Sequence, residues 1–280
     1  MPRVSKRDVK RDITDRRSNR GMPLVLLDKR DGIATVRLNR PEARNSLNPA
    51  LLDELEAAIR DASTDPTVKV VVIAGDEKAF SAGADLKAVI ALFDVWPRYV
   101  DFLHRLHDVF CLIEEAPVPT IAKVRGFALA GGLELILCCD LTIASDNAKI
   151  GDQHANYGLI AGAGGIPRLV RRIGLQRALD IFYTGRWLTG QEAADCGIVL
   201  RSVPDDKLDE EVHKLAREIA SKSRTGLRYM KRAARAGMDL TLEGALAAEQ
   251  AALIEYFSSS PDPKRGLQAF ITKQTPNFDD

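Results

Sequence analysis

The sequence predicts an α/β fold, with a core in which strands alternate with helices and a C-terminal helical region after it. β-Prone segments and helical patterns alternate up to about residue 170, and only helical patterns follow. Residues 68–74 are rich in β-branched side chains, which is typical of a strand buried on both faces. Residues 131–139 are apolar almost all round, which indicates a helix buried in the core.

The elements of the core follow one another in a regular order. Asp31-Gly32 is a hairpin signal between two β-prone segments, and Asn48 before Pro49 is a typical helix cap and first-turn pair. The pattern of apolar residues predicts strands at 24–28, 33–38, 68–74, 118–124, 141–144 and 148–150, and helices at 51–59, 97–114 and 131–139.

The rest of the chain is expected to be helical. The predicted helices lie at 176–183, 190–196, 207–221, 227–236 and 242–257. We therefore divide the chain into a leader at 1–21, a core at 22–200 and a C-terminal helical region at 201–280. The first twenty residues carry eight Lys or Arg and three Asp, which favours a disordered basic leader over a binding arm or a transit peptide.

Composition excludes several classes of protein. The formal net charge of +1 does not suggest a broad nucleic-acid-binding surface, and no apolar run reaches the roughly 18–20 residues that span a bilayer. The four cysteines show no C-x-x-C spacing, so the sequence predicts neither a disulfide framework nor a metal site. A reducing, cytoplasmic setting is the simplest expectation.

Glu134 is the most informative polar residue, because it lies in the first turn of the apolar helix. A buried carboxylate needs a partner, a raised pKa or a chemical task. A proton-transfer role is the functional interpretation, and a carboxylate that interacts with the helix dipole or caps the helix is the structural alternative. Gly131 and Gly132 at the helix start would let a ligand oxygen approach free amides, although tight packing also explains two glycines.

A second loop, residues 78–87, follows the buried strand at 68–74. Its small residues Ser81, Ala82, Gly83 and Ala84 allow a substrate to approach the backbone closely, or simply form a strand-to-helix turn. An amide donor and a carboxylate one turn further on are what proton transfer beside a carbonyl requires. The amide holds the developing oxyanion while the carboxyl group moves the proton.

Six stretches occur in the order and spacing of one known family. They are Leu-Asn-Arg-Pro-Glu-Ala-Arg-Asn-Ser-Leu at 38–47, Phe-Ser-Ala-Gly-Ala-Asp-Leu-Lys at 80–87, Ala-Gly-Gly-Leu-Glu-Leu-Ile-Leu-Cys-Cys-Asp at 130–140, Gly-Leu-Ile-Ala-Gly-Ala-Gly-Gly at 158–165 with Arg168-Leu169 after it, Tyr-Thr-Gly-Arg at 183–186, and Ala-Ala-Asp-Cys-Gly-Ile-Val at 193–199. Together they resemble the crotonase (enoyl-CoA hydratase/isomerase) superfamily over residues 22–275.

The resemblance implies a crotonase-like spiral of ββα turns with a C-terminal helical trimerisation region, in trimers that pair into hexamers. It implies an acyl-CoA thioester as substrate and no separate cofactor, since coenzyme A belongs to the substrate. The oxyanion-hole amides map onto Ala84 and Gly131, and the first acid/base onto Glu134. The substrate and coenzyme A contacts map onto Ala43, Arg44, Ala82, Ala84, Asp85, Leu86, Lys87 and Gly131, with Phe270 and Lys273 reaching a neighbouring subunit's nucleotide. A solvated surface lysine is the alternative for Lys273.

The chain departs from the family at the second acid/base position, where His154 stands in place of the usual glutamate. His154 can orient or deprotonate the water added to an enoyl thioester, because its ordinary pKa lies near working pH. Alternatively, Glu134 works alone as a double-bond isomerase, or the chain catalyses another acyl-CoA reaction, such as thioester or C–C hydrolysis. The structural alternative is a polar pocket-lining histidine bonded to Asp152 or Asn156.

Two rival functions come from other classes. Gly-Ala-Gly-Gly at 162–165 is a weak signal for nucleotide binding, since neither G-x-x-x-x-G-K-[ST] nor G-x-G-x-x-G occurs. A non-catalytic acyl-CoA-binding scaffold would keep the pocket but would not need Glu134. The leading prediction is a lyase that hydrates 2-enoyl-CoA thioesters.

Overall fold

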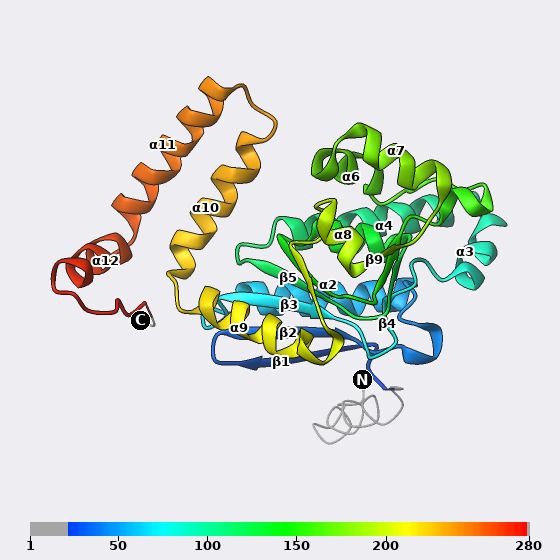
Figure 1. Ribbon diagram of the computed structural model, residues 1–280, viewed down its shortest axis with the longest axis horizontal. Helices are drawn as coiled ribbons and strands as arrows, with labels where there is room; N and C mark the ends of the chain where they lie inside the picture. The colour runs from blue at the N-terminus through cyan, green and yellow to red at the C-terminus, as the bar shows by residue number, and fades with distance from the viewer. Residues whose placement is uncertain (1–21, 279–280) are drawn as a thin grey trace, which may run out of the picture.

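The larger of two sheets forms the base of the fold in this computed structural model, which describes residues 22–278 (Figure 1). Its strand order is β1-β2-β3-β5-β7-β10. The strands are β1 (Val25–Arg30), β2 (Ile33–Leu38), β3 (Val70–Ala74), β5 (Thr120–Val124), β7 (Leu141–Ser145) and β10 (Arg201–Val203). β1 and β2 form an antiparallel hairpin, and the other neighbours in this sheet pair in parallel.

The smaller sheet repeats the order of the larger one. It consists of β4 (Ala79–Ser81), β6 (Phe127–Leu129), β8 (Lys149–Gly151) and β9 (Leu188–Thr189), in the order β4-β6-β8-β9. β4, β6 and β8 each follow a long strand, β3, β5 and β7, and pair in parallel with one another. The expected spiral of ββα turns is therefore confirmed. The helices that follow β4 and β6 begin side by side.

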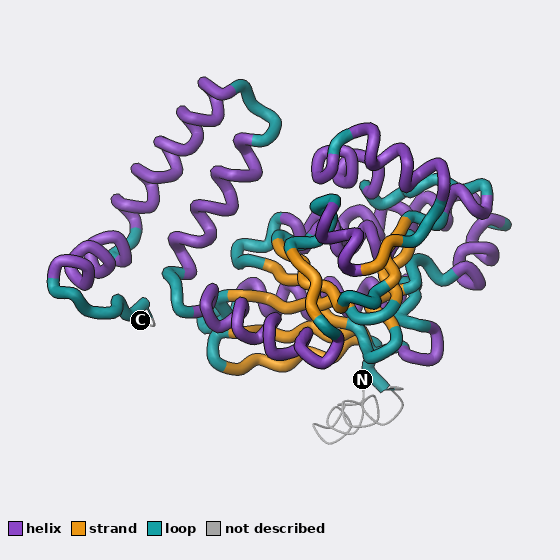
Figure 2. Tube along the Cα trace, viewed as in Figure 1, coloured by secondary structure: helices purple, strands orange, loops and turns teal. Residues whose placement is uncertain are grey.

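The helices enclose these sheets and continue beyond them (Figure 2). Around the core they are η1 (Pro41–Ala43), α2 (Pro49–Thr64), α3 (Leu86–Phe93), α4 (Trp96–Glu114), α5 (Gly131–Cys138), η2 (His154–Tyr157), α6 (Gly165–Ile173), α7 (Leu175–Thr184), α8 (Gly190–Asp195), η3 (Asp205–Lys207) and α9 (Leu208–Ala220). No helix within residues 22–278 is long and apolar enough to cross a membrane.

Two apolar clusters explain why the strand at β3 is buried on both faces. Val71 and Ile73 point into the main core, which includes the apolar side chains of α2, α4 and α5. Val70 and Val72 point the other way, into a smaller cluster that α9 closes with Leu208, Val212 and Ala216. Because side chains alternate along a strand, a strand covered on both faces has no polar positions.

Three further helices, α10 (Arg224–Gly237), α11 (Leu242–Ser259) and α12 (Asp262–Ile271), form an arm that leads away from the core (Figures 1 and 2). α10 and α11 lie side by side, and Gly226 in α10 leaves room for the Tyr256 ring of α11. The arm exposes several large apolar side chains: Met230, Leu242, Leu246, Leu253, Ile254, Phe257, Leu267 and Phe270. This is the region for which we predicted trimerisation.

The expectation of helices alone after residue 170 was wrong, because two strands follow that residue. β9 belongs to the smaller sheet and β10 to the larger one. β9 has two residues and β10 has three, so neither carries an alternating apolar pattern that can be recognised locally. Both exist through pairing with distant strands, β8 and β7. The predicted division at residue 200 thus falls just before a strand of the larger sheet, and the predicted leader at 1–21 lies outside the described residues.

Gly126→Ala tests whether the close backbone contact between residues 126 and 78 requires a glycine. Gly126 has φ +64°, and a Cβ there would lie 1.9 Å from the Lys78 carbonyl oxygen, where β4, β6 and β8 begin. We expect the variant to lower the free energy of unfolding by about 1–3 kcal/mol more than Gly197→Ala does. Gly197 is the control because it also has a positive φ but has no atom within 4 Å of such a Cβ. Equal urea midpoints for the two variants would contradict this account.

Candidate active site

A cavity of about 350 Å³ lies beside the starts of α3 and α5. Its walls are mostly apolar and include Leu47, Val89, Phe93, Phe102, Leu103 and Leu106. The cavity brings together six of the residues predicted from sequence: Ala82, Ala84, Leu86, Gly131, Glu134 and His154. Residues from three separate turns of the spiral therefore meet in one pocket, with few polar groups among its lining side chains.

The two predicted donor amides are neighbours at this cavity. Gly131 is the first residue of α5, and a Cβ built on it would lie 3.4 Å from the Ala84 nitrogen. Leu47 pairs with the residues on either side of Ala84, since its N–H donates to Gly83 O (2.7 Å) and its carbonyl accepts from Asp85 N (2.8 Å). Among the described residues, neither the Ala84 nor the Gly131 amide donates to another protein group. Two donors are thus left for a ligand oxygen.

Close backbone contact fixes these two amides. A Cβ on Gly132 would lie 2.2 Å from the Ser81 carbonyl oxygen, and one on Gly83 would lie 3.0 Å from the Gly131 nitrogen. Gly83 also has φ +95°, which side chains rarely allow. The glycines are therefore required for β4 and its loop to touch the start of α5.

Glu134 projects from α5 into the cavity and is 3% exposed. Its Oε1 accepts hydrogen bonds from Ala163 N (2.7 Å) and Gly165 N (2.9 Å), and its side chain does not cap its own helix. A Cβ on Gly165 would lie 2.8 Å from the Glu134 Cγ, so a glycine is needed there. Burial raises the pKa of Glu134, and the Gly165 and Ala163 amides and His154 only partly offset this rise. The carboxyl group is therefore easier to protonate than an ordinary glutamate.

His154 begins η2 and is held by Asp152, a residue that is 2% exposed. The Asp152 carboxylate accepts from the His154 backbone N (3.0 Å) and lies 2.9 Å from its Nδ1. Burial alone would lower the pKa of His154, but the hydrogen bond and charge of Asp152, together with the charge of Glu134, raise it overall. Because Nδ1 faces Asp152, Nε2 is the nitrogen left for a ligand.

Asp152 and the amide donors of the segment 163–165 are the groups that sequence analysis did not assign. Asp152 was named only as a partner in the structural alternative for His154, and that contact is present. Asn156, the other partner named, instead donates to Gln153 and to the Gly185 carbonyl. The spacing Asp-x-His was a usable signal, whereas the contacts of Glu134 with residues 29 and 31 positions away were not visible in the sequence.

Other predicted contact residues lie outside the cavity lining. The Asp85 carboxylate caps α3 and pairs with Arg40 at 2.7 Å. Arg44 follows η1 and stacks its guanidinium 5.2 Å from the Phe127 ring centroid. Phe270 is 83% exposed on α12, which lies across the molecule from α3 in Figure 1. The roles of Ala43, Arg44, Asp85, Lys87, Phe270 and Lys273 in binding stay predictions, and no group of metal-ligating side chains occurs within residues 22–278.

Comparison with known proteins gives consistent matches over nearly the whole chain. The family model described as "Enoyl-CoA hydratase/isomerase" matches residues 28–280. A Rhizobium meliloti protein named "Probable enoyl-CoA hydratase" is 39% identical over 91% of this chain and 97% of its own. A Dictyostelium discoideum protein named "Probable enoyl-CoA hydratase, mitochondrial" is 36% identical over 90% of this chain and 89% of its own. A cytoplasmic location therefore stays a prediction for this chain.

The solved structures give the same result for the fold. The crystal structure of an enoyl-CoA hydratase from Bacillus anthracis matches with a TM-score of 0.86 and 35% identity. The match covers 91% of this chain and 99% of that one. The fold of this chain is thus shared with a solved structure at appreciable sequence identity.

Ala130→Gly tests for backbone strain at the start of α5. Ala130 has φ 50° and ψ −116°, angles that glycine adopts far more readily than alanine. Relief of about 1–3 kcal/mol of strain outweighs the greater unfolded-state entropy of glycine, so the free energy of unfolding should rise by about 1 kcal/mol. Ala128→Gly in β6 is the control, because Ala128 is buried in a regular strand and its loss should destabilise. A similar fall in urea midpoint for both variants would refute strain at Ala130.

Proposed function

This chain belongs to the enoyl-CoA hydratase/isomerase (crotonase) family, and we propose that it adds water to 2-enoyl-CoA thioesters with Glu134 and His154 as its proton-transfer groups. The observation that carries the proposal is the meeting of these two side chains with the Ala84 and Gly131 amides in one cavity. The substrate class comes from the family, and the distribution of work between Glu134 and His154 comes from the local contacts.

The two amides are proposed to bind the thioester carbonyl oxygen. Water adds at Cβ of the enoyl group, and the electrons of the double bond move onto the carbonyl, giving an enolate. Donors aimed at that oxygen stabilise the enolate more than the substrate, and removing one such donor typically costs about 3–4 kcal/mol of transition-state stabilisation. This role is supported by the closeness of the Gly131 backbone at the start of α5 to the Ala84 nitrogen in the loop before α3.

Glu134 and His154 are proposed to share one proton. Hydration breaks an O–H bond of water and forms a C–H bond at Cα, so the site needs a base and an acid at the same time. The two groups interact electrostatically, because the charge of His154 lowers the pKa of Glu134 and the charge of Glu134 raises the pKa of His154. Their titrations are therefore coupled, and one proton can reside on either group. A pair holding a single proton can accept one from water and deliver the other to carbon.

The assignment of each role follows from the hydrogen bonds. With Nδ1–H donated to Asp152, the neutral imidazole presents an unprotonated Nε2, which can take a proton from water. Burial favours the protonated form of Glu134, which can supply the proton to Cα. We therefore assign water activation to His154 and Cα proton transfer to Glu134. If Glu134 acts alone, the same site is a double-bond isomerase.

The oligomer is part of the proposal. We propose a homotrimer or a dimer of trimers assembled through α10–α12, supported by the exposed apolar side chains of this arm. In that assembly Phe270 and Lys273 would contact the nucleotide end of coenzyme A bound to a neighbouring core. Ala43, Arg44 and the loop at 82–87 would bind the coenzyme A bound to their own core.

Glu134→Gln tests the central role of the carboxylate. Glutamine can still accept from Ala163 N and Gly165 N through its amide oxygen, but it cannot transfer a proton. We expect kcat to fall at least 100-fold in a screen of enoyl-CoA thioesters that follows hydration and double-bond migration separately. The thermal midpoint should change little. Retention of full turnover by a folded variant, or no turnover by the parent, would count against the proposed function.

His154→Ala separates hydratase from isomerase chemistry. We expect hydration of crotonyl-CoA to fall by about 100-fold while exchange of the Cα proton in deuterated water continues. The parent should show a bell-shaped pH profile, because no base remains when both groups are protonated and no acid remains when neither is. The variant should lose one limb of the bell. His107→Ala, at an exposed position on α4, is the control. Unchanged hydration in His154→Ala would exclude the histidine as second catalytic group.

A further inference from the structure

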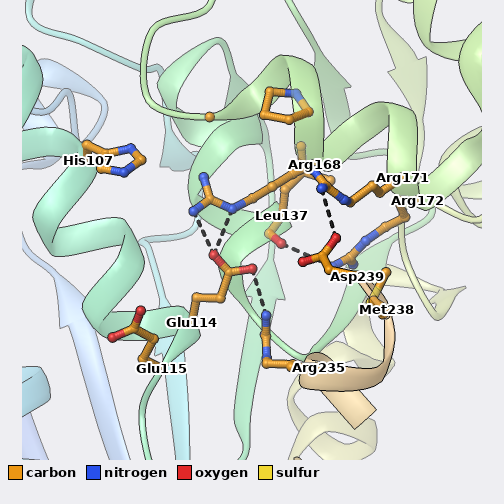
Figure 3. A pocket seen from close by; sticks show the side chains of 12 residues that line it. His107, Glu114, Glu115, Leu137, Arg168, Arg171, Arg172, Arg235, Met238 and Asp239 are labelled. Atoms are coloured by element: carbon orange, nitrogen blue, oxygen red, sulfur yellow. Dashed lines mark hydrogen bonds and ion pairs between the residues drawn. The ribbon is translucent and has the colours of Figure 1, made fainter. Parts of the chain in front are cut away.

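Arg168 of α6 touches the segment that holds Glu134 but does not line the active-site cavity. Its Nη1 donates to the Ala163 carbonyl at 2.8 Å, and the amide of the same residue, Ala163, donates to Glu134. The segment thus lies between two cavities: Ala163 lines the one with Glu134, and Gly164 lines a second cavity of about 450 Å³ (Figure 3). Arg168 contacts the segment from the side of the second cavity.

Charged partners hold the Arg168 guanidinium in its position. Glu114 at the end of α4 accepts from Arg168 Nε at 2.9 Å and from Nη2 at 2.6 Å, and its other oxygen accepts from Arg235 Nη1 at 2.6 Å. Arg235 belongs to α10 and also donates to Asp140 at 2.8 Å. Figure 3 shows Glu114 between the two arginines. Two charge-assisted hydrogen bonds to the same Glu114 oxygen orient the guanidinium more firmly than a single contact does.

Two consecutive glycines accommodate the two side chains. A Cβ on Gly164 would lie 2.1 Å from Arg168 Nη1, and a Cβ on Gly165 would lie 2.8 Å from Glu134 Cγ. Gly164 also has φ +93°. The segment therefore packs closely against Arg168 on one side and against Glu134 on the other. A shift of the arginine would move the segment and, with it, the Glu134 carboxylate.

We propose that Arg168 is a positioning residue for Glu134, acting through residue Ala163, whose carbonyl accepts from Arg168 and whose N–H donates to Glu134. We call these contacts the clamp, and propose that Glu114 and Arg235 link it to the helical arm at α10. This inference rests on the proposed function, because its readout is the proton transfer assigned to Glu134. Because these contacts connect α10 with Ala163, a change in the position of α10 would change the position of the Glu134 carboxylate.

Glu114→Ala is the discriminating variant, because charge and position predict opposite pH shifts. Loss of a nearby negative charge alone would lower the pKa of Glu134 and move its limb of the pH profile to lower pH. If the clamp loosens instead, the Ala163 amide holds the carboxylate less well, the pKa of Glu134 rises, and the limb moves to higher pH. We expect this upward shift, together with a roughly tenfold fall in kcat at nearly constant KM.

Glu115→Ala is the matched control, since Glu115 is the adjacent, exposed residue and makes no marked contact in Figure 3. It removes the same charge beside the same cavity and should leave kcat and the pH profile unchanged. A downward shift, or identical kinetics for the two variants, would overturn the proposal. If the parent itself shows no turnover, or folded Glu134→Gln remains fully active, the proposed function fails rather than the clamp.

A second pair of variants tests the link to the arm and does not depend on Glu114→Ala folding. Arg235→Met should lower kcat several-fold at nearly constant KM, although Arg235 lies on α10. The readout here is kcat, because loss of a positive charge alone would also raise the pKa of Glu134. Arg232→Met on the same helix is the control, because Arg232 is exposed and pairs with Glu255 of the arm. Combined with Arg168→Met, the Arg235→Met effect should be less than additive. Full additivity would exclude a shared clamp.

Discussion

The active site depends on one buried interaction, in which the Glu134 carboxylate accepts hydrogen bonds from the Ala163 and Gly165 amides. A carboxylate that is 3% exposed among apolar side chains carries a large desolvation cost, and hydrogen bonds limit that cost. The two amides fix the side chain without adding a charge that would keep it permanently ionised. They leave its pKa above the ordinary value, which suits the proton-transfer role proposed for Glu134.

The double-layered spiral explains how residues far apart in sequence reach this carboxylate. Each turn places a short strand after a long one, so the loop after β4, the start of α5 and the segment after β8 lie in successive layers. The loop and α5 supply the backbone donors, and the third turn supplies Asp152 and His154. The glycines are found where these layers touch, because a side chain there would meet a neighbouring backbone.

The sequence predicted what is encoded locally. The strand at 33–38, the buried helix at 131–139 and the burial of Glu134 follow from apolar patterns, and the structure agrees within a residue or two. The family resemblance supplied the pairing of Ala84 with Gly131, which no local pattern contains. β9 and β10 were missed because strands of two and three residues exist only through long-range pairing. The contacts of Glu134 with 163–165, and of Arg168 with Glu114, depend likewise on tertiary packing.

The Asp152–His154 pair limits how this position can vary. Asp152 is almost fully buried and its carboxylate is satisfied by the backbone and ring of His154. A glutamate at 154, the residue that the family resemblance leads us to expect there, would bring a third carboxyl group next to Asp152 and Glu134. Like charges packed so closely cannot all ionise. Residues 152 and 154 should therefore change together among related chains, so that histidine accompanies aspartate and glutamate accompanies an uncharged neighbour.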